Sequence, residues 1–236
     1  MPTQRAPDAK PDGRRQRADG ARSRQAILHA VTELATVEGL DGLSIARLAE
    51  HAGMSKSGLF AHFRSKEDLQ LATIDAAAEM FDREVMQPGK AAPPGVSRIL
   101  SSCEAFFQYL KRAVFPGGCF FVAAAAELDA KKGPVRDHLR EVYSRILEGL
   151  ADVIREAQLL GEIDAAEDVA QLTFELDSLM LGANFAYVFF GDPAALDRAR
   201  LAIRQRLARA APLVAAQGPR ASASGRARRR RRGKRA

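Results

Sequence analysis

Two serine–lysine pairs stand close together in the stretch GMSKSGLFAHFRSKEDL, residues 53–69: Ser55 with Lys56, and Ser65 with Lys66. Serine favours the N-cap position of a helix. The first turn of a helix exposes unpaired N–H groups and binds anions such as phosphate, and a neighbouring lysine adds a full positive charge. A lysine beside such a helix start is suited to binding an anion such as phosphate, and the alternative is two lysines that are merely solvated.

Four helices in the N-terminal third of the chain must position these lysines. Apolar residues at helical spacing predict the first helix, and Gly39 ends it, because glycine suits the left-handed C′ position. Each of the next three helices begins at a serine N-cap, and these serines are Ser44, Ser55 and Ser65. We expect the fourth helix to run towards Met86.

Ala49, Gly53 and Leu59 have the spacing of a helix-turn-helix. The small residue lets the second helix cross closely, the glycine takes the left-handed turn, and Leu59 anchors the second helix to the core. The triplet alone is weak evidence. Together with the serine N-caps and the aromatic pair Phe60 and Phe63, it is a specific pattern.

The rest of the chain is also helical in pattern, without the alternation typical of strands. We therefore expect an all-α protein with about nine helices. The segment QPGKAAPPG, residues 87–95, is rich in glycine and proline and is expected to be a loop after the fourth helix.

Charge is unevenly distributed along the 236 residues, which carry a net charge of +7. Residues 1–24 hold 7 Lys/Arg and 3 Asp, and residues 219–236 hold 9 Lys/Arg and no acid, which leaves the central part at −6. Both ends are poor in apolar residues, as disordered basic arms are.

Membrane, metal and disulfide chemistry are not indicated. The most apolar run, Leu179–Phe190, has 12 residues, whereas a membrane span needs about 20. The two cysteines, Cys103 and Cys119, give no disulfide framework or metal pattern. We expect a cytoplasmic protein without a membrane partner, a metal or a cofactor.

The stretch ARSRQAILHAVTELATVEGLDGLSIARLAEHAGMSKSGLFAHFRSKEDL closely resembles the DNA-binding domain of the TetR family of bacterial transcriptional regulators, and the resemblance covers residues 21–75. Weaker similarity, in FPGGCFFVAAAAELD and GPVRDHL, extends over much of the remainder. It implies a helix-turn-helix DNA-binding domain joined to a larger helical ligand-binding and dimerisation domain. The expected division is a disordered basic arm at 1–20, the DNA-binding domain at 21–67, the larger domain at 68–214 and a disordered basic tail at 215–236.

The resemblance also implies that Lys56 and Lys66 contact DNA. Lys66 and the helix start at Ser65 are expected to hold one DNA phosphate, and Lys56 to reach guanine or phosphate from the start of the recognition helix. Phe60 stands where the family often has tyrosine and lacks its hydroxyl, and His62 either meets phosphate or is a polar surface residue. The expected DNA contacts are Ser44, Arg47, Ser55, Lys56, Ser57, Gly58, Phe60, His62 and Lys66.

The larger domain contains more apolar bulk than one helix interface needs, interrupted by a few polar residues. This combination is typical of a small-molecule cavity, and the alternative is an ordinary core. The expected ligand-binding residues are Cys103, Phe106, Phe107, Leu110, Phe120, Phe121, Ala124, Glu175, Asn184 and Tyr187.

Two helices near the C-terminal end, at 167–190 and 193–211, are expected to build the dimer. The first is apolar nearly all round towards its end, which indicates burial on more than one side. In the TetR family the last two long helices of each subunit form a four-helix bundle with the partner. The resemblance therefore implies a homodimer that binds palindromic DNA.

The sequence as a whole predicts a DNA-binding transcriptional regulator. Its expected form is a repressor that binds a palindromic operator as a homodimer and is released by a small, largely apolar effector. The alternative is a non-specific architectural protein that binds DNA through the arginine-rich segment Arg226–Ala236. An enzyme is not expected, because the chain has 4 His and no nucleophile elbow, metal cluster or phosphate loop.

Overall fold

A computed structural model describes residues 13–51 and 53–212; for residues 13–22, Ile45 and Phe60 it describes the backbone alone. This part of the chain is all helical, with ten α-helices, one π-helical turn and no strand. The helices are α1 (Gly13–Glu38), α2 (Ile45–His51), α3 (Lys56–Phe60), α4 (Lys66–Phe81), the π turn η1 (Asp82–Met86), α5 (Gln87–Lys90), α6 (Val96–Lys111), α7 (Phe120–Leu128), α8 (Pro134–Leu159), α9 (Val169–Phe189) and α10 (Ala194–Ala210).

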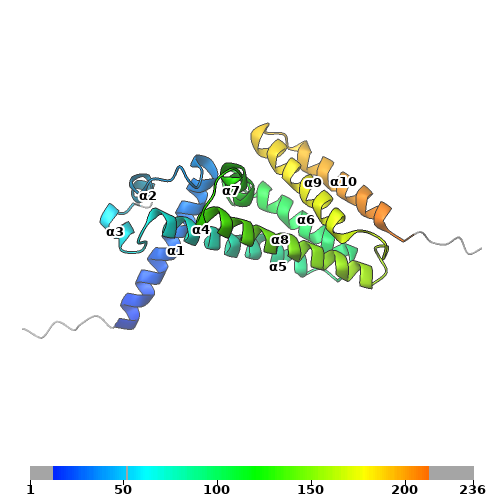
Figure 1. Cartoon of the computed structure of the whole chain (residues 1–236), viewed down its shortest axis with the longest axis horizontal. Helices are drawn as coiled ribbons and strands as arrows, with labels where there is room; N and C mark the ends of the chain where they lie inside the picture. Colours follow the sequence, from blue (N-terminus) through cyan, green and yellow to red (C-terminus); the bar gives the residue numbers. More distant parts are fainter. Residues whose placement is uncertain (1–12, 52, 213–236) are drawn as a thin grey trace, which may run out of the picture.

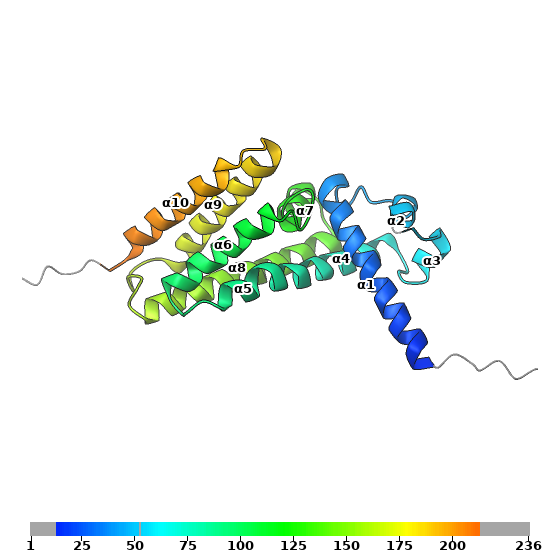
Figure 2. The same cartoon turned by 180° about the vertical axis from the view of Figure 1, so that it is seen from behind.

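The molecule is elongated, with one group of helices at each end (Figure 1). Helices α1, α2 and α3 form one end, and the antiparallel pair α9 and α10 forms the other. Helix α4 leaves the first group and runs alongside α8 into the larger domain, as the reverse view also shows (Figure 2). One long helical path, from α4 through η1 to α5, therefore connects the two domains.

The predicted helix starts are confirmed by the hydrogen bonds of three serines. Ser44 Oγ accepts from the Arg47 N–H at 3.2 Å. Ser55 Oγ accepts from the Gly58 N–H at 3.1 Å, and Ser65 Oγ accepts from the Asp68 N–H at 3.0 Å. Each serine occupies one N–H group that the helix itself leaves unpaired.

Two features differ from the sequence-based expectation. Residues 87–90 of the expected loop are helical, because α4 passes through η1 directly into α5. Pro88 fits there, since it lies in the first turn of α5, where its missing N–H is not needed. Residues 13–20 of the expected disordered arm belong to α1, whereas residues 1–12 and the tail at 215–236 lie outside the described part.

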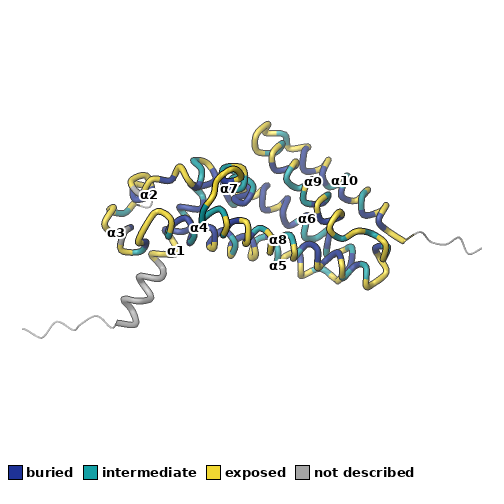
Figure 3. Tube along the Cα trace, viewed as in Figure 1, coloured by how far each residue is buried: buried dark blue, intermediate teal, exposed yellow. Residues whose placement is uncertain are grey.

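A single apolar core runs through both domains. Buried residues follow the facing sides of the helices along the whole length of the molecule (Figure 3). Leu59 anchors the helix-turn-helix in this core, as the sequence predicted, and Phe63 is buried beside it. Ile74 and Phe81 continue the core along α4. The helix-turn-helix end is therefore packed against the larger domain rather than tethered to it.

Helix α6 ends in a Schellman turn with an unusual residue at C′. The Ala113 N–H donates to Leu110 O at 3.0 Å and the Val114 N–H to Tyr109 O at 3.4 Å. Ala113 is exposed and has φ +47°, the one non-glycine residue with positive φ in the described part. An L-residue is strained in this conformation, and glycine is not.

Ala113→Gly should therefore raise the free energy of unfolding by about 0.5–1 kcal/mol and the melting temperature by about 1–4 °C. Thermal unfolding followed by circular dichroism measures the change. Ala91→Gly is the matched control, because Ala91 is an exposed helix C-cap with φ −68° and should lose stability. Equal effects of the two substitutions would contradict the assignment of strain to Ala113.

Candidate DNA-binding surface and ligand cavity

The described DNA-contact candidates lie together on the exposed side of the helix-turn-helix. Lys56 is exposed at the start of α3 and makes no ion pair with any described residue. Gly58 and His62 are half-buried, and the side chain of Phe60 lies outside the described part. The remaining candidates, all exposed, are Ser44, Arg47, Ser55, Ser57 and Lys66.

Two of these cations already have partners within the chain. The Lys66 ammonium donates to the main-chain oxygen of Asp41 at 2.5 Å and lies 3.6 Å from its carboxylate. Arg47 forms an ion pair with Glu38 at the end of α1. Both side chains remain on the surface, so each can exchange its carboxylate for a DNA phosphate at modest cost.

The turn between α1 and α2 is held by Glu127 of α7. Its carboxylate accepts from the Leu40 N–H at 2.6 Å and from the Asp41 N–H at 2.9 Å. Gly39 has φ +84°, and a Cβ atom there would lie 2.8 Å from the Glu127 carboxylate. Glycine thus suits both the positive φ and the close approach of this carboxylate, and we name the contact the Glu127 clamp.

Further bonds strengthen this connection between the domains. The Lys131 ammonium, just after α7, is 2.6 Å from the Asp41 carboxylate, and its hydrogen bond holds the pKa of that carboxyl below the usual value. Gln70 of α4 donates to Leu40 O at 3.1 Å. The Gly117 N–H donates to Thr36 Oγ1 at 3.1 Å. The helix-turn-helix is thus attached to the larger domain by directional bonds as well as by the core.

A largely apolar cavity lies in the larger domain between α4–η1, α6, α7, α8 and α9, with about 720 Å³ of space including its open side. Residues from η1 take part in the wall, because Val85 and Met86 both face the cavity. Of the ten expected ligand-binding residues, this cavity is lined by Cys103, Phe106 and Phe121.

The other seven expected ligand-binding residues lie outside the cavity wall. Leu110, Phe120 and Ala124 are buried in the core. Phe107 is buried on the opposite side of α6, where the Arg200 guanidinium stands 5.1 Å from its ring centroid. The three polar candidates serve contacts between helices or pack at the core: Glu175 pairs with Arg206, Asn184 accepts from the Cys119 N–H at 3.0 Å, and Tyr187 is half-buried.

Four polar residues of the cavity wall were not predicted from the sequence: Lys90, Ser102, Tyr143 and Asp177. Tyr143 of α8 and Asp177 of α9 contact each other. The Tyr143 hydroxyl lies 3.1 Å from each oxygen of the Asp177 carboxylate and donates to it. Burial raises the pKa of Asp177 above its usual value. The sequence signal was a single acid within the apolar stretch LDSLMLGANF, three residues before the inward-facing Met180.

The cysteine thiols of the cavity are kept protonated by their surroundings. Burial raises the pKa of Cys103 to about 12 and that of Cys119 to about 11. A thiol rather than a thiolate is poorly nucleophilic. The two side chains therefore serve as small, weakly polar parts of the wall.

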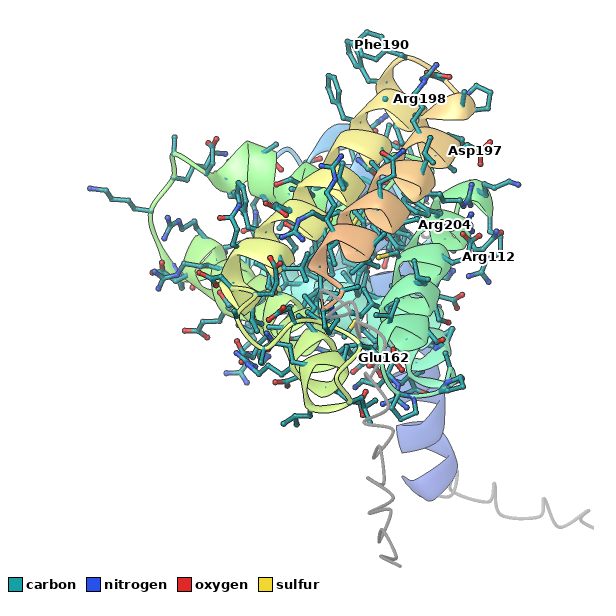
Figure 4. The ribbon with its side chains drawn as sticks, turned by 90° about the vertical axis from the view of Figure 1, so that its right-hand side faces the viewer. Arg112, Glu162, Phe190, Asp197, Arg198 and Arg204 are labelled. Atoms are coloured by element: carbon teal, nitrogen blue, oxygen red, sulfur yellow. The ribbon has the colours of Figure 1, made fainter. Side chains whose placement is uncertain are left out.

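Helices α9 and α10 present an uncovered apolar face. Phe174, Phe185 and Phe189 lie on one stripe of α9, and Phe189 is 70% exposed. Figure 4 shows the two helices side by side, with Phe190 at the end of the hairpin. Between them runs a shallow groove lined mainly by small residues, including Ser178, Gly182, Ala195, Ala199 and Ala202.

None of the helices in the described part is both long and apolar enough to cross a membrane. No group of three or more His, Cys, Asp or Glu residues in that part is arranged to hold a metal ion.

Comparison with known proteins identifies both domains. Residues 27–73 match the family described as bacterial regulatory proteins of the tetR family, and residues 95–203 match the tetracyclin repressor-like C-terminal domain. Among curated proteins, the HTH-type transcriptional repressor BepR of Brucella suis is 25% identical over 67% of this chain and 78% of its own. The transcriptional regulator AcuR of Cereibacter sphaeroides is 27% identical over 64% of this chain and 69% of its own.

The fold agrees with these matches. The crystal structure of a TetR transcriptional regulator from Chloroflexus aurantiacus superimposes with a TM-score of 0.75 and 25% identity, covering 81% of this chain and 96% of that one. The two family matches coincide with the exposed helix-turn-helix and with the domain that holds the cavity. The chain belongs to the TetR family of bacterial transcriptional regulators, and it is a helix-turn-helix DNA-binding protein.

Proposed function

We propose that this regulator is a cytoplasmic repressor that binds a palindromic operator as a homodimer and dissociates when a small, largely apolar effector enters the cavity. The observation that carries the proposal is the physical link between the two sites. The cavity wall includes η1 and α7, and these same elements lead to the DNA-binding end through α4 and the Glu127 clamp.

Dimerisation is supported by the apolar face of α9 and α10. Exposed aromatic rings on one stripe, next to a groove of small residues, suit self-association about a two-fold axis, because each subunit offers both a ridge and a groove. A symmetric dimer presents two copies of α3, which explains the expected preference for palindromic DNA.

Effector control is supported by the position of the cavity. A compound that binds more tightly to a form with altered α4 or α7 geometry shifts the protein towards that form. A coupling free energy of about 1–3 kcal/mol lowers operator affinity about 5- to 150-fold. The architectural alternative, which relies on the basic tail, gives no role to the ordered helix-turn-helix or to the cavity.

The DNA-binding assignment is tested with Lys56→Ala and Lys66→Ala. Lys56→Ala should relax the preference at one or two base pairs, costing about 1–3 kcal/mol if the lysine contacts guanine well. Lys66→Ala should weaken binding to all sequences about equally, since a phosphate contact does not read bases. Binding of both variants to a randomised operator library measures affinity and preference together.

Lys111→Ala is the matched control, because Lys111 is exposed on α6 in the larger domain and outside the cavity wall, and its loss should leave both quantities unchanged. If Lys66→Ala alters base preference while Lys56→Ala does not, the two roles are exchanged. Absence of any sequence preference in the unmodified protein would instead favour the architectural function.

A further inference from the structure

The cavity contains one acid that no cation in the described part neutralises. Asp177 makes no ion pair with any residue of the described part, and its hydrogen-bond partner there is the neutral hydroxyl of Tyr143. Burying a carboxylate away from water is unfavourable unless a cation or several hydrogen bonds compensate it. The protein's own described side chains therefore compensate the charge of the half-buried Asp177 only through the Tyr143 hydroxyl.

Aromatic rings surround the same part of the cavity. The ring of Phe121 stacks on that of Tyr143, with centroids 6.1 Å apart and an angle of 13° between the planes. Phe81 meets Phe121 edge-on at 5.6 Å, and Phe106 also lines the wall. Aromatic faces attract cations, and the attraction grows when water is excluded.

The other charged residue of the lining, Lys90, is a weaker determinant. It lies on the short helix α5 and is exposed, so water screens its charge. The half-buried Asp177 is screened less. The carboxylate, rather than the lysine, therefore dominates the electrostatic preference of the enclosed part of the cavity.

From this geometry we infer that the effector is an apolar organic cation, an aromatic or aliphatic body with one protonated amine or quaternary ammonium group that pairs with Asp177. The inference rests on the proposed function and names the chemical class of its ligand. Phe121 and Tyr143 supply ring faces for the cationic group, and the apolar wall accommodates the body of the molecule.

Three probes of similar size separate charge from shape. Benzyltrimethylammonium carries a permanent cation, neopentylbenzene is its neutral carbon analogue, and 3-phenylpropanoate is an anion. Titration calorimetry with the full-length protein should show the cation binding at least about tenfold more tightly than the neutral probe. The anion should bind most weakly.

Asp177→Asn should remove this preference, lowering the affinity for the cation at least about tenfold while changing that for neopentylbenzene less than about twofold. Tyr143→Phe keeps the carboxylate and should keep the preference for the cation. This variant loses the same hydrogen bond as Asp177→Asn, so it shows whether a disturbed cavity wall alone would remove the preference. Asp152→Asn is the charge-matched control, because Asp152 is exposed on α8 outside the cavity.

Equal or tighter binding of the neutral or anionic probe would overturn the inference and leave the apolar effector of the proposed function in place. A preference for the cation that survives Asp177→Asn would also overturn it. If none of the three probes binds, the cavity is not an effector site for molecules of this size, and the effector part of the proposed function falls with the inference.

Discussion

Replacing both Phe185 and Phe189 by glutamate should prevent the proposed dimer from forming and lower operator affinity at least about a hundredfold. The two rings stack on each other at 5.1 Å on the uncovered stripe of α9. A two-fold axis would bring four new carboxylates close together, where repulsion and desolvation oppose association. A monomer then holds only one half-site and loses the gain from simultaneous binding.

Light scattering after size-exclusion chromatography gives the mass of the particle, and titration of labelled operator DNA gives its affinity. Leu159→Glu is the control, since Leu159 is 89% exposed at the end of α8 and should leave both measurements unchanged. A double glutamate variant that remains a dimer would place the interface on a different face of the molecule.

Replacing Glu127 by alanine should release the turn between α1 and α2 and abolish effector control. Two hydrogen bonds from backbone N–H groups to a carboxylate are lost, and the partial exposure of the site limits the cost to about 2–4 kcal/mol in the free energy of unfolding. Glu127 is the residue of α7 itself that bonds this turn, and the Lys131–Asp41 and Gly117–Thr36 contacts come from the segments that flank α7. We expect these flanking contacts to transmit too little of a change in α7 to replace the clamp. The effect of any releasing compound on operator affinity should fall below about twofold.

Hydrogen exchange is the direct measurement, because the amides of Leu40 and Asp41 donate to the lost carboxylate. Their exchange should accelerate at least about thirtyfold, which is the factor expected when the free energy of local opening falls by about 2 kcal/mol. Glu141→Ala, an exposed substitution on α8, should change neither exchange nor control. Retained effector control in Glu127→Ala would mean that α4, or the Lys131–Asp41 and Gly117–Thr36 contacts, carries the coupling instead of the clamp.

The parts of this structure that were predictable from sequence are those that local chemistry decides. A serine N-cap bonds an N–H group three residues ahead, so Ser55 and Ser65 could be recognised from their neighbours. The helix-turn-helix spacing is equally local. Pro88 was misleading because glycine and proline usually mark a break, whereas here the preceding π turn carries the helix into a first turn that accepts proline.

The cavity and the clamp depend on contacts between residues distant in sequence. Asp177 and Tyr143 are 34 residues apart in the sequence, and Glu127 and Leu40 are 87 residues apart. Neighbouring aromatic residues on α6 also point in directions about 100° apart, which is why Phe106 lines the cavity while Phe107 packs under Arg200. Because α6 carries apolar residues on both of these sides, the sequence did not show whether Phe106 or Phe107 faces the cavity.

The π turn between α4 and α5 also bears on how such a regulator diversifies. A π turn holds one residue more than an α-helix would use over the same path, and here it brings Phe81, Val85 and Met86 to one wall. The loss or gain of a single codon in this stretch would rotate the residues beyond it while α1, α2 and α3 stay unchanged. Descendants of one ancestral gene could in this way acquire new inducers and still recognise the same promoter.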